Sequence, residues 1–347
     1  AASPFVIFLL LTLLLYCPPV QRWAVGIATQ YASEKTGMDI SIEDVRLRFP
    51  IDISLNGVKA IQQNDSLPHV KDTIIDARDV LCDIQLRPLF KGKVEVDALL
   101  FDSVTLNTNG FVSDCRVKGK VRQLSVVSHG IDLKNDSVLI NKARMTGADL
   151  DICLSDTAKE DTTKSETPWL VKVKNLDITK SRIKVHLPGD TLNITASIGS
   201  FGVRNGFFDL KSSEYRLASA TLADSRLQYD NRFETKVKGL DYNHIDISRL
   251  NLSIADLMFR QEEKNYSLAM LVRDSHLYEK SGLTIKSLKG KIDLDTAAVH
   301  VNDLSLITPY STIKGNIDFA FTTFDATNPG KTNACLDASL GKEDVMI

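Results

Sequence analysis

The sequence predicts a mainly β protein that begins with two helices and continues as an extended, repetitive sheet. Three observations lead to this fold class. An uncharged apolar run fills residues 5–16, apolar residues at helical spacing follow it, and apolar–polar alternation begins at Met38 and recurs to the end of the chain. The balance of 42 basic and 44 acidic side chains in 347 residues leaves no cationic excess. We therefore expect no nucleic-acid partner.

The first segment, residues 1–19, is expected to be a membrane anchor. Its apolar run of twelve residues would span ~18 Å as a helix, whereas the hydrocarbon core of a bilayer is ~30 Å thick. We therefore expect further apolar residues upstream of this sequence. The anchor residues are Phe5, Val6, Ile7, Phe8, Leu9, Leu10, Leu11, Leu13, Leu14, Leu15 and Tyr16.

Two other interpretations of this segment are a cleaved signal peptide and a lipoprotein signal that ends at Cys17. Signal cleavage requires small residues before the cut, and the residues around Tyr16 and Cys17 are not small. A lipoprotein signal would also require a small residue at position 16. An uncleaved anchor is the favoured interpretation, and it places everything after Pro19 outside the cytoplasm.

Residues 20–37 are predicted to form a short amphipathic helix. Val20, Trp23, Ala24 and Ile27 recur at the spacing of one helical face. Gly37 stands where a helix C-terminus favours a residue with positive φ. The apolar stripe fits either the interfacial zone of a membrane or packing against the first strands, and both can hold together.

From Met38 onward the apolar residues recur at every second position, which indicates strands. One such pattern runs through residues 45–55, and others recur every 8 to 12 residues. Short turn signals separate them, at residues 64–66, 135–137, 188–190 and 205–206. No helical pattern intervenes. This spacing predicts an extended sheet or solenoid and disfavours a compact sandwich.

The most polar stretch, residues 155–167, is expected to be an exposed loop. It divides the sheet into a first segment, residues 38–154, and a second segment, residues 168–347. The second segment ends within an alternating pattern, so we expect the natural chain to continue beyond it.

The sequence offers little that indicates catalysis. It contains no phosphate-binding glycine loop, no zinc-protease motif and no nucleophile elbow, and its six His and five Cys are scattered. Two SxxK matches, at residues 181–184 and 311–314, lack the other motifs of penicillin-binding enzymes. We expect no enzyme activity, no catalytic residues, no cofactor and no metal site.

Residues 13–58 resemble the N-terminal signature of TamB-type members of the AsmA-like family of Bacteroidota. The matching features are the apolar run, PPVQ at residues 18–21, a short helix, TG at residues 36–37 and the strands that follow. Residues 175–185 and 282–294, and STIKG at residues 311–315, are similar in style to strand pairs of that family. The chain departs from the family in its short anchor and in the absence of the family's C-terminal domain.

The resemblance implies a periplasmic body anchored once in the bacterial inner membrane, with a sheet folded into an apolar groove. Its implied function is phospholipid transport and outer-membrane biogenesis, including assembly of outer-membrane proteins. The implied partners are membrane phospholipid, the inner membrane and an outer-membrane BamA- or TamA-like protein, the last through a C-terminal region absent here. The alternative function is a structural or adhesive solenoid that binds protein partners and carries no lipid.

The residues expected to line the groove share apolar side chains at alternate positions. They are Leu176, Ile178, Ile183, Val185, Leu250, Leu252, Ile254, Val299, Val301, Leu304 and Leu306. If the sheet folds over on itself only in part, these residues stay accessible to acyl chains. A sealed two-sheet core would bury the same residues.

Eight short motifs match the pattern of periplasmic O-glycosylation in Bacteroidota, which is Asp, then Ser or Thr, then a small or apolar residue. The third residue of the pattern is Ala, Ile, Leu, Val, Met or Thr. The matches start at Asp65, Asp72, Asp102, Asp136, Asp156, Asp161, Asp190 and Asp295. Asp and Ser also close turns between strands, which explains many of these matches without a glycan. Two fall in the polar loop, and we hypothesise that Thr157 and Thr162 carry O-glycans in the native host. The intact mass of native protein tests this, because the mass of the bare polypeptide would disprove it.

Overall fold

The computed structural model describes most of the strands and leaves their longer connections aside. It describes residues 19, 22, 25, 26, 29, 30, 33, 34, 37–48, 52–63, 71–84, 96–108, 115–132, 137–154, 170–187, 191–209, 212–231, 241, 243–260, 265–323, 333–339 and 345–346. The expected anchor residues, from Phe5 to Tyr16, and the expected glycan sites Thr157 and Thr162 lie outside these residues. The expected helix over residues 20–37 is described only at isolated positions, so it stays a prediction.

The described chain is mainly β and falls into two compact units. Unit 1 comprises Ala1–Gly130 and Arg144–Leu154, and unit 2 comprises Ile131–Ala143 and Ser155–Ile347. The expected boundary over residues 155–167 lies outside the described residues.

Unit 1 is an antiparallel sheet in which β3 pairs with β1, β2 and β4, and β5 pairs with β4 and β6. Its strands are β1 (Asp39–Ser41), β2 (Asp44–Arg48), β3 (Asp52–Gln63), β4 (Lys71–Ile84), β5 (Val96–Asn107), most of β6 (Cys115–Asp132) and the second half of β7 (Ser137–Leu154). Its core residues are Ala77, Val80, Val104, Val121 and Ala148. The alternating pattern over residues 45–55 belongs to two strands, β2 and β3, which pair antiparallel from Asp44↔Asn56 to Arg48↔Asp52.

Unit 2 is an antiparallel meander, since each long strand pairs with the next in the chain. Its strands are β8 (Leu170–Leu187), β9 (Leu192–Asp209), β10 (Glu214–Asn231), β11 (His244–Arg260), β12 (Asn265–Glu279), β13 (Thr284–Ile285), β14 (Ser287–Leu294), β15 (Ala298–Ile307), β16 (Thr312–Thr323), β17 (Asn333–Ser339) and β18 (Val345–Met346). The sheet is open and does not close on itself.

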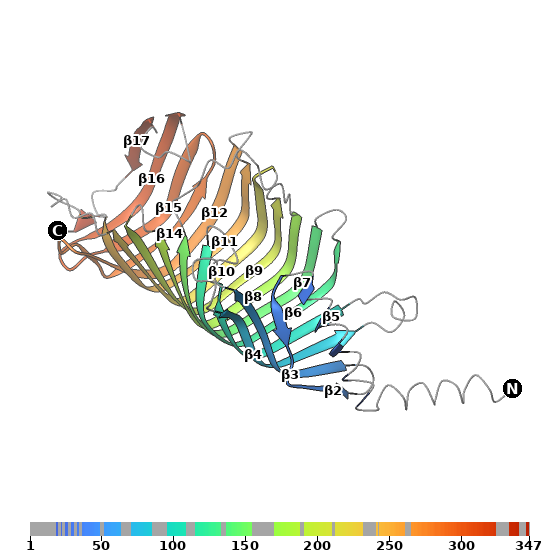
Figure 1. The fold of residues 1–347 in the computed structure, drawn as a ribbon. Helices are drawn as coiled ribbons and strands as arrows, with labels where there is room; N and C mark the ends of the chain where they lie inside the picture. Colours follow the sequence, from blue (N-terminus) through green and yellow to red (C-terminus); the bar gives the residue numbers. More distant parts are fainter. Residues whose placement is uncertain are drawn as a thin grey trace, which may run out of the picture. The chain divides into compact units, whose positions relative to one another are not determined.

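The strands are longer than the 8-to-12-residue spacing predicts. Strands β8, β9 and β10 have 18 residues each, and Figure 1 shows that the long strands bend midway. Each bent strand has two arms, and alternating patterns that look like two strands, such as residues 176–178 and 183–187, are the arms of one strand, β8. The expected turn at residues 205–206 is wrong, because Asn205 lies inside β9 with a φ of 52°.

Candidate functional site

One face of the unit 2 sheet carries an unbroken row of apolar side chains. Residues directly opposite each other on paired strands project from the same face. Pair by pair, the registers from β8 to β16 join one residue from each long strand. The row is Leu176, Val203, Ala220, Ile254, Met270, Ile292, Val301 and Ile317.

A second row runs beside the first, and a third lies beyond the bend. The second row is Ile178, Phe201, Leu222, Leu252 and Val272. The third row is Ile183, Ala196, Leu227, Ile247, Leu277 and Ile285. We call the surface made by these three rows the apolar face.

The other expected groove residues extend this pattern. Val185 is opposite Ile194, and Val299 is opposite Leu294 and Phe319. Leu304 is opposite Gly315, and Leu306 is opposite Leu288 and Ile313. Leu250 lies two residues from Leu252, opposite Ser225. Every one of the expected groove residues is half-buried, and none is fully buried. Sequence reasoning missed the residues that β9, β10, β12, β14 and β16 contribute, because their register with β8 cannot be read from one strand.

The bend changes the spacing of the positions on the apolar face from two residues to three. On β10, Leu222 and Ser225 lie on either side of Asp224, which has a φ of 49°. On β15, Val301 and Leu304 lie on either side of Asp303, with a φ of 54°. A residue in this left-handed conformation adds one position to the strand and bends it. The apolar side chains of both arms therefore face the same side.

Buried serines hold the chain together at two of these bends. Ser181 and Ser225 are 5% and 4% exposed, and each follows directly on a residue with positive φ. The hydroxyl of Ser181 donates to the Thr179 carbonyl at 2.9 Å, and that of Ser225 donates to the Ala223 carbonyl at 2.8 Å. Each hydroxyl thus bridges the bend residue before it. Ser181, the serine of one SxxK match, therefore has a structural role.

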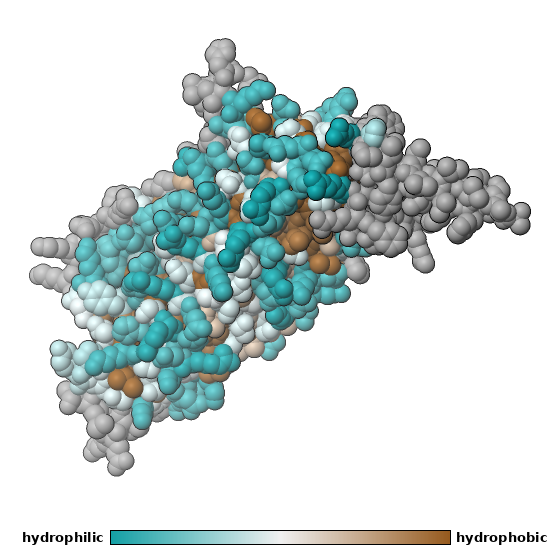
Figure 2. All heavy atoms as spheres, turned by 90° about the horizontal axis from the view of Figure 1, so that it is seen from below, coloured by the Kyte–Doolittle hydropathy of each residue, from teal (hydrophilic) through white to brown (hydrophobic). Residues whose placement is uncertain are grey.

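The opposite face of the sheet is polar. One of its rows runs through Asp177, Gly202, Thr221, Ser253, Leu271, Lys291 and Asn302. Figure 2, seen from below the bends of Figure 1, shows a mainly hydrophilic surface with scattered apolar residues. The polar face is thus on the outside of the bends, and the apolar face lines their inside.

Ion pairs connect neighbouring strands across the polar face. Arg204 contacts Asp177 at 2.7 Å, and Lys291 contacts Asp303 at 2.7 Å. The guanidinium of Arg226 donates to both carboxylate oxygens of Asp246. That hydrogen bond lowers the pKa of Asp246 below its ordinary value, against the opposing effect of desolvation. Such exposed pairs each contribute little to stability.

An aromatic row follows one margin of the sheet, where β9 ends and β12 begins. The ring centroids of Phe208 and Tyr215 are 6.4 Å apart, those of Tyr215 and Phe259 are 5.8 Å apart, and those of Phe259 and Tyr266 are 4.9 Å apart. All three pairs are tilted, a favourable geometry for aromatic contacts. Val171 is opposite Phe208 in the register, so the row extends as an apolar margin as far as β8.

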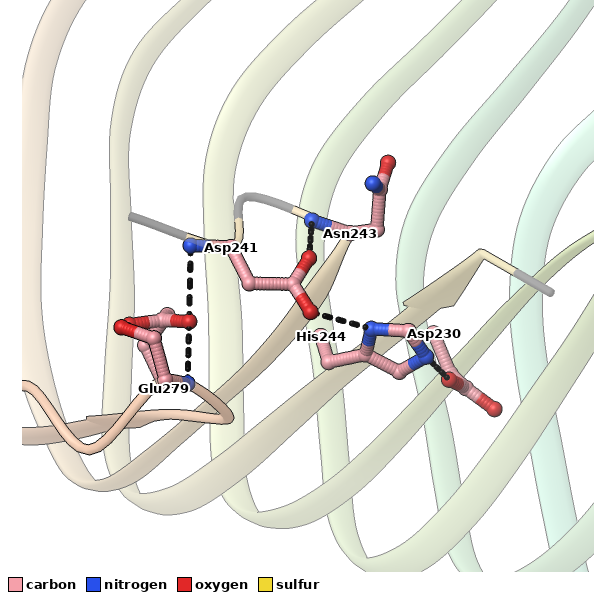
Figure 3. Close-up of polar contacts among 6 residues, drawn as sticks. Asp230, Asp241, Asn243, His244 and Glu279 are labelled. Carbon is pink, nitrogen blue, oxygen red and sulfur yellow. Dashed lines mark hydrogen bonds and ion pairs between the residues drawn. The ribbon is translucent and has the colours of Figure 1, made fainter. Parts of the chain in front are cut away.

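At the other margin a polar cluster connects the ends of three strands (Figure 3). Glu279, at the end of β12, is fully buried, and it accepts hydrogen bonds from the amides of Asp241 and Ser281 at 2.7 Å and 2.6 Å. His244, at the start of β11, lies between Asp241 at 3.1 Å and Asp230 at 3.0 Å. The cluster therefore holds the residues that lead into β11 against the end of β12.

Burial and hydrogen bonding act in opposite directions on Glu279. Desolvation raises the pKa of this carboxyl group, but the hydrogen bonds from Ser281 and from the Asp241 amide lower it, and the net pKa lies below its ordinary value of 4.5. The carboxylate is therefore ionised and saturated with donors. A group in this state stabilises its surroundings and is poorly suited to proton transfer.

The described part of the chain offers no competing kind of site. It contains no group of three or more His, Cys, Asp or Glu side chains that could hold a metal ion. None of its helical residues belongs to a helix that is both long and apolar enough to cross a membrane.

The comparisons with known proteins leave the family open. No protein-family model matches this chain, and no curated protein matches it with significance. The geometry of the two faces therefore carries the functional argument.

Proposed function

We propose that this protein is an inner-membrane-anchored periplasmic bridge whose bent sheet forms a groove for phospholipid acyl chains. In this proposal the apolar face is the floor and walls of the groove, and lipid headgroups stay at its open side. The transported phospholipid would move toward the outer membrane, in support of envelope biogenesis and outer-membrane protein assembly.

The observation that carries the proposal is the continuity of the apolar face. The first row passes from Leu176 on β8 to Ile317 on β16 without a charged residue. Each methylene kept out of water is worth ~0.8 kcal/mol, so an acyl chain gains several kcal/mol by lying along such a surface. Because every position of the row is apolar, the acyl chain can slide from one strand to the next without a large barrier.

Half-burial of the expected groove residues favours an open groove over a sealed core. A second sheet packed onto this face would remove residues such as Leu252 and Val301 from solvent, yet both keep part of their surface exposed. A structural solenoid without lipid would leave this surface in contact with water, which is unfavourable for so large an apolar area.

Mass spectrometry of the detergent-extracted protein tests the proposal. We expect phospholipid to copurify with the full chain and to be exchanged for added phospholipid that carries an isotope label. A chain that is folded and free of phospholipid after extraction from lipid-rich membranes would exclude a lipid groove and favour the structural solenoid.

The anchor and the periplasmic location belong to the same proposal and need their own test. A reporter enzyme that is active only in the periplasm, fused after Val58, should be active and membrane-bound. Active reporter released in soluble form, after cleavage near Cys17, would contradict the uncleaved anchor.

A further inference from the structure

Exposed large apolar residues are concentrated at one place in unit 2. Among the described residues, the large hydrophobic side chains with the greatest exposure are Tyr310 at 85%, Tyr278 at 50%, Leu283 at 40%, Ile307 at 37% and Leu154 at 36%. All except Leu154 lie in two turns or at the strand ends that flank them, within residues 278–287 from the end of β12 to the start of β14 and within residues 305–314 from the end of β15 to the start of β16. We call these two turns the apolar tip.

The two turns are neighbours. The Lys286 amide donates to the Ile307 carbonyl at 2.7 Å, and Ser287 is opposite Ile307 in the β14–β15 register. Leu283 lies three residues before Lys286, and Tyr310 lies three residues after Ile307. Four apolar side chains therefore share one margin of the sheet, on the side where the polar cluster of Glu279 lies.

Both turns are held rigidly by their own hydrogen bonds. In the first, the Glu279 amide donates to the Leu283 carbonyl at 3.0 Å, and the Glu279 carboxylate accepts from Ser281. In the second, the Thr308 hydroxyl accepts from the amides of Tyr310 and Ser311 at 3.2 Å and 2.8 Å. The backbone at Leu283 and Tyr310 is thus held in place, and a contact made through these turns loses little backbone conformational entropy.

Lysines give the apolar tip a net positive charge. Its two turns contain Lys280, Lys286, Lys289 just beyond, and Lys314, all exposed. The single acidic residue in the turns is Glu279, which is fully buried and saturated with hydrogen bonds. The acidic residues beside the tip, Asp246 opposite Tyr278 and Asp274 beside Ser287, are each paired with an arginine. Exposed tyrosine, leucine and isoleucine beside lysines are the combination that enters the headgroup region of an anionic membrane.

We infer that the apolar tip binds the surface of an anionic phospholipid membrane, with Leu283 and Tyr310 entering the headgroup region and the lysines contacting lipid phosphates. An acidic protein surface would use the lysines equally well, but it would not account for the exposed Leu283 and Tyr310 beside them. This inference goes beyond the groove, because it concerns the outside of one margin and holds whether or not the apolar face carries lipid.

Co-flotation with vesicles tests the inference on the full chain held in phosphatidylcholine nanodiscs. The nanodisc covers the N-terminal apolar segment, so this segment does not bind the added vesicles. We expect the protein to float with added vesicles containing about one third phosphatidylglycerol, and to float poorly with pure phosphatidylcholine vesicles. The double substitution Leu283→Ser with Tyr310→Ser should reduce flotation about tenfold. Leu154→Ser, at an exposed leucine outside the tip, is the matched control and should float like the natural chain.

A fluorescent reporter locates the contact. In a Tyr310→Trp variant, phospholipid brominated near the headgroup should quench the added tryptophan, with the natural chain supplying the background of its own two Trp residues. Any of three results would overturn the inference. They are unchanged flotation of the double variant, flotation that does not depend on phosphatidylglycerol, and an unquenched Trp at position 310. Copurification of phospholipid is a separate measurement, so failure of the groove and failure of the tip are distinguishable.

Discussion

Gly199 on β9 packs against the backbone of Asp224 on β10, so closely that a Cβ at position 199 would lie 2.5 Å from the Asp224 carbonyl oxygen. Asp224 is the bend residue of its strand, and Gly199 lies beside it where β9 bends. The bend therefore depends on a close approach of two strands as well as on one residue with positive φ.

Gly199→Ala should destabilise unit 2 by about 1 to 3 kcal/mol, because backbone atoms of Asp224 would have to move away from the new methyl group. Gly290→Ala is the matched control. Its Cβ would lie 3.5 Å from the nearest backbone atoms, which is ordinary contact. Thermal unfolding measures both variants, and equal melting temperatures would show that the bend tolerates a side chain at position 199.

Ser225→Ala should cost about 1 to 3 kcal/mol, because it removes a buried hydroxyl that donates to the Ala223 carbonyl and accepts from the Gly199 amide at 3.2 Å. Ser197→Ala, at an exposed position of β9, should have almost no effect. Urea unfolding followed by circular dichroism compares the two variants. If Ser225→Ala lost no more stability than Ser197→Ala, the hydroxyl of Ser225 would not support the bend.

Leu252→Asp should lower the amount of copurifying phospholipid, because it places a charge in the second row of the apolar face. Ser253→Asp introduces the same charge one residue along β11, on the polar face opposite Thr221 and Leu271, and should leave the lipid content unchanged. Val301→Asp tests the same face on β15.

The folded state of these variants separates the groove from a sealed core. A folded Leu252→Asp chain with little lipid supports an open groove, whereas unfolding of the chain supports a sealed core. Equal lipid content in Leu252→Asp and Ser253→Asp would mean that lipid binds elsewhere.

Glu279 should make the stability of unit 2 depend on pH in the acidic range. Because its pKa is lower in the folded chain than the ordinary value of 4.5, its contribution is fully present above that value and is lost as the pH falls through the folded pKa. Glu279→Gln should therefore lower the melting temperature at neutral pH and flatten its fall as the pH drops below about 4.5. Parallel melting curves for the natural chain and the variant would contradict this role. Asp303→Asn, which breaks an exposed ion pair and keeps a residue type that tolerates the positive φ at this bend, is the control.

Alternation at every second residue was sufficient to predict a mainly β chain and to select side chains from one face of β8, β11 and β15. The bends were missed, although they leave a signal: the alternation is interrupted, because the next apolar residue on the same face is three positions on at 301–304 and five positions on at 178–183 and 222–227. A turn was predicted at Asn205 because residues that adopt positive φ occur both in turns and in bulges within strands.

The partners of each row could not be predicted, because register depends on the lengths of the connections as well as on the pattern of each strand. The apolar tip was missed for a different reason. Leu283 and Tyr310 look like ordinary apolar residues in a sequence, and only the fold shows that they are exposed and lie in neighbouring turns.

The meander of unit 2 has a consequence for how such a protein can change in size. Each long strand pairs with its neighbours in the chain, and the rows cross all of them in the same order. Duplicating one hairpin, such as β9 with β10, would lengthen every row by two strands, or about 10 Å, without altering any existing pair. The reach of the molecule can thus be adjusted by copying hairpins, while the chemistry of its inner surface stays the same.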